Sequence, residues 1–219
     1  VCMDKNFFRV VSSAATRELD KYHILKFLDE DVSFKDVTED ICCLGLFGPK
    51  SREMISKISN DDFSNDKFKF GTGKFIRING FKVWAQRLSY VGELGFELYV
   101  DSSLAKDLYE ILIEEGKNFE LSHCGMHAMD IMRMESGFVH WGHDISPEEN
   151  QYQAGLKFAI SYKKNVNFIG KDALLKIKDQ KLDKRMMMFT LKDSKTLLLY
   201  TADAADDFTS VELGGRRIR

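Results

Sequence analysis

The dipeptide Asn79-Gly80 constrains the fold of this chain more than any other local feature. It lies between two short apolar segments, and Asn-Gly is the preferred pair for a two-residue type I′ turn. Such a turn pairs Ile78 with Phe81 and places alternate apolar side chains on one face. The pattern therefore predicts an antiparallel β-hairpin, whose second strand we expect to run on to Tyr90.

Apolar periodicity predicts the remaining elements. In chain order they are a strand at 7–13, a helix from about 16 to 28, a buried strand at 41–48, a helix beginning at Pro49, a strand at 96–100, a helix from about 103 to 115 capped by Gly116, a Met-rich helix at 123–136 ending at Gly137, strands at 156–162 and 186–191, and a short helix entered at 167–174. The β-α-β-β-β-α order in the middle of the chain predicts an α+β fold with a ferredoxin-like layer.

Composition excludes several classes of protein. The chain has 219 residues, 44% of them hydrophobic, and a net charge of −2, so no global field favours nucleic acid or an anionic membrane as partner. The 4 cysteines form no Cys-x-x-Cys pair, which argues against a zinc site or a disulfide framework. No apolar run approaches the ~20 residues of a membrane span, and the first residues do not resemble a signal peptide. We expect a cytoplasmic protein, or one of the mitochondrial matrix if the source is eukaryotic.

The segment 89–99 combines turn formers with groups that can bind a polar ring. Gly92 and Gly95 let the backbone turn sharply and approach a flat ligand closely. Glu97, on a strand, could accept two hydrogen bonds from the N–H and exocyclic amine of a reduced pterin. Spacing alone favours a plain turn with solvated glutamates, because Gly-x-x-Gly turns are common.

Four motifs in the same order along the chain favour the ligand-binding interpretation of this segment over a plain turn. They are Asp36-Val37-Thr38 followed by Leu44-Gly45-Leu46-Phe47-Gly48-Pro49, Tyr90-Val91-Gly92-Glu93-Leu94-Gly95-Phe96-Glu97-Leu98-Tyr99, Met132-Arg133-Met134-Glu135-Ser136-Gly137-Phe138 followed by Trp141-Gly142-His143-Asp144, and Ala154-Gly155-Leu156 followed by Phe168-Ile169-Gly170-Lys171. Over about residues 7 to 200 the chain resembles the glycine cleavage T-protein (aminomethyltransferase) family. It is most similar to the C-terminal folate domain of dimethylglycine and sarcosine dehydrogenases.

The resemblance implies the aminomethyltransferase fold and tetrahydrofolate as cofactor. Tyr90 and Glu97 are expected to contact the folate, with Glu97 at the pterin edge, and the ring of Phe158 is expected beside it. Leu98, Tyr99 and Arg133 complete the predicted cofactor-binding set.

Two departures from the family pattern bear on activity. Met129 stands where the T-protein has a folate-binding Arg, which favours the dehydrogenase branch. The segment with the family's catalytic Asp would lie upstream of Val1, so no catalytic residue is assigned within the chain. We therefore expect the isolated chain to be inactive, and any FAD to be bound by a separate domain of the parent protein.

The implied reaction is transfer of a one-carbon unit from an N-methyl amine, such as dimethylglycine, sarcosine or the glycine cleavage intermediate, to give 5,10-methylenetetrahydrofolate. Folate and a small methylated amine are the implied partners. Two alternatives remain: a non-catalytic folate-binding module, and a folate-dependent demethylase of a sulfonium substrate. The motif Lys-Gly-Cys-(Tyr or Phe)-x-Gly-Gln-Glu of the non-catalytic relatives does not occur here.

The same resemblance suggests a domain division. We expect 1–44 to belong to a first folate-binding subdomain, 45–145 to the ferredoxin-like subdomain, and 146–200 to a truncated C-terminal β-rich subdomain. Residues 201–219 are small and acidic, then basic, and we expect them to be a non-native tail.

Histidine pairs offer a metal site as a further alternative. His140 and His143 are three apart, and His123 and His127 are four apart on an expected helix. A His-x-x-His pair without a third partner is a weak metal signal, and no His-Glu-x-x-His motif occurs. We expect no metal, and a turn packed around Trp141 instead.

Overall fold

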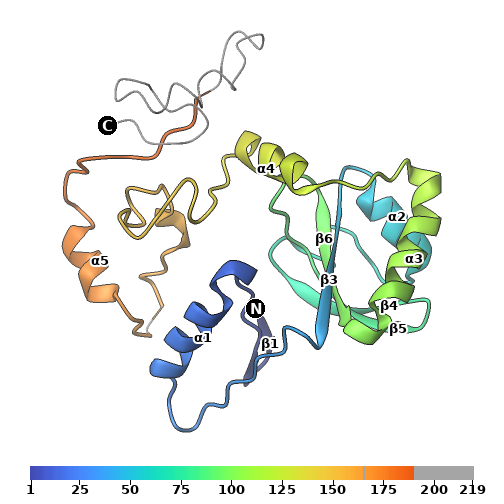
Figure 1. The fold of residues 1–219 in the computed structure, drawn as a ribbon, viewed down its shortest axis with the longest axis horizontal. Helices are drawn as coiled ribbons and strands as arrows, with labels where there is room; N and C mark the ends of the chain where they lie inside the picture. The colour runs from blue at the N-terminus through green and yellow to red at the C-terminus, as the bar shows by residue number, and fades with distance from the viewer. Residues whose placement is uncertain (165, 190–219) are drawn as a thin grey trace. The chain divides into compact units, whose positions relative to one another are not determined.

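The computed structural model describes residues 1–164 and 166–189. It consists of two compact units, Val1–Cys124 and Gly125–Arg219, whose elements are shown in Figure 1. The boundaries expected at 44, 145 and 200 stay a prediction. No helix in the described part is long and apolar enough to cross a membrane.

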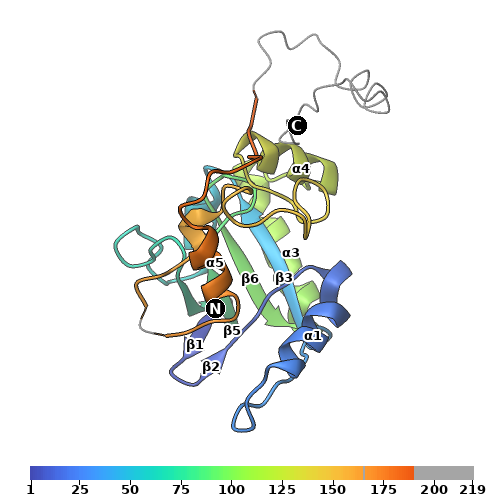
Figure 2. The same cartoon turned by 90° about the vertical axis from the view of Figure 1, so that its left-hand side faces the viewer.

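The first unit is built on a four-stranded antiparallel sheet. Its strands are β3 (Ile41–Phe47), β4 (Gly73–Ile78), β5 (Phe81–Gln86) and β6 (Gly95–Asp101), in the order β3-β6-β5-β4. Figure 2 shows β3 and β6 side by side. The α+β class expected from the sequence is confirmed, and β6 of this sheet carries Glu97, Leu98 and Tyr99.

The predicted hairpin is confirmed in type and register. Asn79 and Gly80 have φ angles of 46° and 88°, as a type I′ turn requires, and Ile78 pairs with Phe81. The second strand ends at Gln86 and does not reach Tyr90. It ends there because the Leu88 N–H turns back and donates to the Gln86 carbonyl oxygen, 3.1 Å away.

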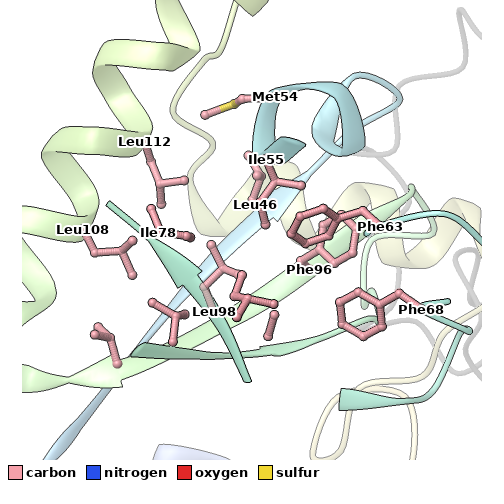
Figure 3. Packing of buried hydrophobic residues seen from close by; sticks show 14 residues of the cluster. Leu46, Met54, Ile55, Phe63, Phe68, Ile78, Phe96, Leu98, Leu108 and Leu112 are labelled. Carbon is pink, nitrogen blue, oxygen red and sulfur yellow. The ribbon is translucent and has the colours of Figure 1, made fainter. Parts of the chain in front are cut away.

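Two helices cover one face of the sheet. They are α2 (Ser51–Ile58) and α3 (Ala105–Gly116), the latter preceded by the 3₁₀ turn η2 (Ser102–Leu104) and followed by η3 (Lys117–Phe119). Figure 3 shows the core between these layers, which includes Leu46, Met54, Ile55, Phe63, Phe68, Ile78, Phe96, Leu98, Leu108 and Leu112. Alternate residues of β6, Phe96, Leu98 and Val100, and the helical stripe of α3 meet in this core.

The connectivity corrects the expected ferredoxin-like layer. A ferredoxin-like fold is a split β-α-β arrangement, in which the strands before and after the first helix are parallel. Here β3 and β4 are the opposite edges of the sheet and run antiparallel, since all three neighbouring pairs between them are antiparallel. The unit is therefore a two-layer α+β fold of different strand order.

The end of α3 also differs from expectation. Gly116 is the last helical residue and has a right-handed φ of −58°, whereas Glu120 has the left-handed φ of 59°. A Cβ at Gly116 would lie 2.4 Å from Leu121. Gly116 is needed because Leu121 packs closely against it, and it is not a left-handed cap.

The first 40 residues form a small hairpin and a helix. The strands β1 (Cys2–Asp4) and β2 (Phe7–Phe8) pair with each other, and η1 (Ala14–Thr16) leads into α1 (Arg17–Lys26). The helix is confirmed. The strand expected at 7–13 is only two residues long, because within the described residues β2 has no strand partner besides β1.

The second unit contains α4 (Met126–Glu135), η4 (Lys157–Ala159) and α5 (Lys171–Ile177). Gly137, with φ of 72°, ends α4 in a Schellman motif: the Phe138 N–H donates to the Arg133 carbonyl oxygen and the Gly137 N–H to that of Met134.

Two strands expected in this unit are not found. Residues 156–162 form no strand, and neither do 186–189. A strand needs a ladder of backbone hydrogen bonds to a neighbour, and in the described part of the unit these segments belong to no sheet, although the Met186 N–H donates to the Gln153 carbonyl oxygen at 2.8 Å. Residues 190–191 and the tail at 201–219 lie outside the described residues.

Candidate functional site

Alternation along β6 separates the core from a polar face. Phe96 and Leu98 are fully buried among the core residues, so Glu97 and Tyr99 point to the opposite face of the sheet. Leu98 was predicted to bind the cofactor, but its side chain lies on the core face, where it packs and cannot reach a ligand beside Glu97. Its backbone alone could take part.

Glu97 and Tyr99 interact directly. The Tyr99 hydroxyl donates to Oε2 of Glu97 at 2.5 Å, and this bond fixes the carboxylate on the sheet. Burial, followed by the hydrogen bond to Glu97, raises the pKa of Tyr99 above its ordinary value. The hydroxyl therefore stays protonated at neutral pH and remains a donor.

The strand register sets the other neighbours of Glu97. Gly45 of β3 and Gln86 of β5 are its cross-strand partners, and Gly95 lies two residues before it on β6. Both glycines leave space that the ring of Phe47 occupies, since a Cβ at Gly45 or Gly95 would meet this ring at 2.5 or 2.1 Å. Glu97 thus has an aromatic surface on one side and a polar amide on the other.

The loop between β5 and β6 carries Tyr90. Tyr90 is half-buried, and Gly92 takes a left-handed φ of 78°, which favours glycine at this position. The end of the loop is fixed to the start of α2, because the Leu94 carbonyl oxygen accepts hydrogen bonds from the Gly48 N–H and the Ser51 hydroxyl. The sharp bend expected before Glu97 is found at Gly92, whereas Gly95 is already the first residue of β6 and does not take part in it.

A hollow of about 260 Å³ adjoins this face. Tyr99 and Cys43 line it, together with the segment Arg9–Ala14 and the start of α1. The Arg9 guanidinium lies over the Tyr99 ring, 5.2 Å from its centroid, and Arg17 pairs with Asp36 at 3.0 Å. The lining of the hollow is mostly apolar, and its charged groups are the Arg9 guanidinium beside Tyr99 and the Arg17–Asp36 ion pair.

Cys43, an exposed residue of β3, has a thiol with a raised pKa. Desolvation, followed by the charge of Glu97, raises the pKa of this thiol to about 11. Because the thiolate is the reactive form, a neutral thiol at physiological pH contributes surface rather than chemistry.

A larger hollow, of about 680 Å³, opens elsewhere on the sheet. It lies along the outer edge of β4 and is lined by the hairpin and the segment Lys57–Asp61. None of the predicted site residues lines it.

Arg133, in the second unit, is held in a buried polar network. Its guanidinium donates to Asp130 at 2.7 Å, to the Phe138 carbonyl oxygen at 3.1 Å, and to Asp144. Asp144 also accepts the His140 backbone N–H at 2.8 Å. These contacts give Arg133 a structural role in the turn, and its predicted contact with folate stays a prediction.

The turn at residues 140–144 carries two of the histidines considered as metal ligands. His140 and His143 stack with ring centroids 4.4 Å apart, but no three His, Cys, Asp or Glu residues in the described part are grouped as metal ligands. Trp141 is 53% exposed. The turn is therefore organised by the buried carboxylate of Asp144 and not, as expected, by packing around Trp141.

Phe158 lies in η4 of the second unit with its side chain 86% exposed. A large exposed aromatic ring is available for stacking on a flat ligand. Its predicted place beside the pterin stays a prediction, as do the cofactor contacts of Tyr90, Glu97 and Tyr99.

Comparison with known protein families shows which family this chain belongs to. Residues 1–164 match the GCVT N-terminal domain. The chain belongs to that family. It is a family of folate-dependent one-carbon transfer, so the resemblance drawn from the four motifs is confirmed.

Two curated relatives and one solved structure extend this result. The chain is 39% identical over 165 residues to 4-methylaminobutanoate oxidase (formaldehyde-forming) of Paenarthrobacter nicotinovorans, covering 75% of this chain and 20% of the relative. It is 34% identical over 176 residues to human mitochondrial dimethylglycine dehydrogenase, covering 77% and 20%. The chain thus spans about a fifth of the length of these relatives.

The solved structure shows the fold. It is the glycine cleavage system aminomethyltransferase T from Bartonella henselae, with a TM-score of 0.61 and 22% identity, covering 75% of this chain and 44% of that one. The expected aminomethyltransferase fold is therefore confirmed as a fold, over the part of the chain that this structure covers.

Sequence reasoning missed two neighbours of Glu97. Phe47 and Gln86 lie about 50 and 11 residues from Glu97 along the chain, and only the strand register brings them together. Phe47 stood within a recognised motif, but nothing local distinguished Gln86 from any other polar residue in a strand.

Proposed function

We propose that this chain binds tetrahydrofolate at Glu97, and that its parent protein transfers a one-carbon unit from an N-methyl amine to that cofactor, giving 5,10-methylenetetrahydrofolate. The observation that carries the proposal is the placement of Glu97. Its carboxylate stands half-buried on a rigid strand, is oriented by Tyr99, and forms no ion pair with a described Lys, Arg or His.

The acceptors at the site fit the ligand. A reduced pterin offers a ring N–H next to an exocyclic amine, and a carboxylate can accept both in bidentate fashion. One hydrogen bond from Tyr99 leaves three of the about four lone-pair positions of Glu97 open. A basic side chain paired with Glu97 would have competed with those donors.

The residues of this chain would bind and orient, while the cofactor carries the chemistry. Glu97 accepts the donors of the ring edge, Tyr99 keeps the carboxylate from rotating, and Phe47 supplies an apolar surface beside it. When bound, tetrahydrofolate supplies the nucleophilic nitrogen for the one-carbon unit. Holding two reactants in a fixed geometry is itself a large part of such catalysis.

The names of the relatives support an N-methyl amine as donor. One oxidises 4-methylaminobutanoate and another acts on dimethylglycine. These are said of those proteins; for this chain, the donor class is part of the proposal. The sulfonium donor and the non-catalytic module remain the alternatives.

Calorimetric titration of tetrahydrofolate into the 219-residue chain tests the proposal. Glu97→Gln should weaken binding about 10- to 100-fold, since a hydrogen bond to a charged group contributes about 1.5–3 kcal/mol. Tyr99 would hold the remaining oxygen of the amide, so the NH₂ group would face the donors of the pterin. Glu93→Gln, an exposed change in the same loop, is the matched control. Equal affinities of Glu97→Gln and the control variant would refute the proposed site.

A further inference from the structure

Gln86 is buried next to Glu97 with an unsatisfied acceptor. Its side chain is on β5 directly opposite Glu97 and on the same face of the sheet. The residue is only 7% exposed, and its Oε1 has no hydrogen-bond partner within the described part of the chain. Buried polar atoms are almost always paired, and an unpaired one costs stability. A bound ligand would explain why the acceptor is retained.

Among the strand neighbours of Glu97 in the described part of the chain, Gln86 is the side chain that could extend the acceptor edge. On the other side, Gly45 has no side chain, and Gly95 precedes Glu97 on its own strand. Tyr99 is a donor already engaged by Glu97. Within the described sheet, the polar edge therefore continues towards β5.

A second buried atom on β5 does not share this role. The indole Nε1 of Trp84 is also unpartnered among the described residues. The Trp84 ring, however, lies over Gly73 of β4, where a Cβ would come within 2.4 Å of it. Because β4 is on the far side of β5 from Glu97, this ring lies beside Gly73, the cross-strand partner of Gln86 on β4, and not beside Glu97.

We propose that Gln86 is a specificity-determining residue of the pterin site, and that its Oε1 accepts the exocyclic amine hydrogen that Glu97 leaves free. This inference rests on the proposed folate site. An amine bound by a bidentate carboxylate uses one of its two N–H bonds, and the second points sideways along the same edge. Cross-strand partners have Cβ atoms about 4.5–5.5 Å apart, which lets two adjacent acceptors share one amine.

A cycle of ligands and variants tests the assignment. Tetrahydrofolate and a 2-desamino-2-methyl analogue are titrated into the chain, Gln86→Leu, Glu97→Gln and Trp84→Phe. Gln86→Leu should weaken tetrahydrofolate about 5- to 10-fold, in line with one hydrogen bond, and leave the analogue unchanged. Trp84→Phe should change neither affinity by more than about 2-fold. The Tm of unliganded Gln86→Leu should be unchanged or higher, because an unsatisfied buried acceptor is removed.

The outcomes separate the two proposals. If Glu97→Gln weakens tetrahydrofolate but Gln86→Leu does not, the assignment of Gln86 is overturned and the folate site stands. Equal weakening of both ligands by Gln86→Leu, or a clearly lower Tm, would give Gln86 a structural role and also overturn the assignment. If Glu97→Gln leaves tetrahydrofolate binding unchanged, both proposals fall.

Discussion

The Tyr99 hydroxyl donates a 2.5 Å hydrogen bond to the carboxylate of Glu97, two residues away on the same face of β6. Tyr99 is 7% exposed, whereas Glu97 is only half-buried. The carboxylate is therefore held from the protein side and open on the other side. This asymmetry is what a binding residue needs, because it fixes the direction of the remaining lone pairs before a ligand arrives.

The raised pKa of Tyr99 makes the folded state sensitive to alkaline pH. The folded pKa lies above the ordinary value of 10, so the unfolded chain loses this proton first as pH rises. The stabilisation is complete below pH ~10 and is lost above it. In urea unfolding between pH 8 and 11, Tyr99→Phe should therefore reduce the loss of unfolding free energy. Tyr22→Phe, at an exposed position, should keep the wild-type slope; equal slopes in all three proteins would contradict the prediction.

The Arg133–Asp144 pair should hold the second unit together. Both side chains are almost fully buried, and Asp144 also binds the His140 backbone. Asp144→Asn should lower the unfolding free energy by about 3 kcal/mol, since the buried Arg133 guanidinium loses its buried carboxylate partner and keeps only the half-exposed Asp130 as an ion-pair partner among the described residues. Asp130→Asn removes a carboxylate that is half exposed and should cost less than about 1 kcal/mol. Chemical denaturation of the two variants measures both losses of unfolding free energy. Similar losses would show that the buried Arg133–Asp144 pair contributes no more to stability than the Arg133–Asp130 pair.

Leu98 should matter for stability and not for ligand contact. Its side chain is completely buried between the sheet and the helices. Leu98→Ala should destabilise the first unit by about 2–5 kcal/mol, through lost burial and the cavity left behind. Leu25→Ala, at an exposed site, should change the unfolding midpoint little. A loss below about 1 kcal/mol for Leu98→Ala would show that the core is less well packed than the structure indicates.

The turn between β4 and β5 gives a purely conformational prediction. Gly80 has φ of 88°, and a Cβ there would meet no atom within 4 Å, so Gly80→Ala adds strain without a clash. It should cost about 1–2 kcal/mol, the penalty for a left-handed conformation. Asn79→Gly, which tolerates the same region, should be close to neutral. Thermal unfolding of the two variants distinguishes them, and a neutral Gly80→Ala would refute the turn assignment.

The sequence by itself determined the features that depend on neighbouring residues. Asn79-Gly80 specified the turn type and thus the hairpin register, and the apolar segment from Phe96 to Val100 specified a strand that carries Glu97. The motifs around Tyr90 and Arg133 identified the family. Each of these signals acts over a few residues, through backbone dihedral preferences and side-chain periodicity.

Only the tertiary structure decided how those pieces combine. The strand order β3-β6-β5-β4 departs from the ferredoxin-like layer and sets Gly45 and Gln86 on either side of Glu97. It also assigns Leu98 to the core and Arg133 to a buried ion network. Such pairings depend on burial and hydrogen bonding between segments far apart in the chain, and a short stretch of sequence carries no information about which distant strand will satisfy its backbone.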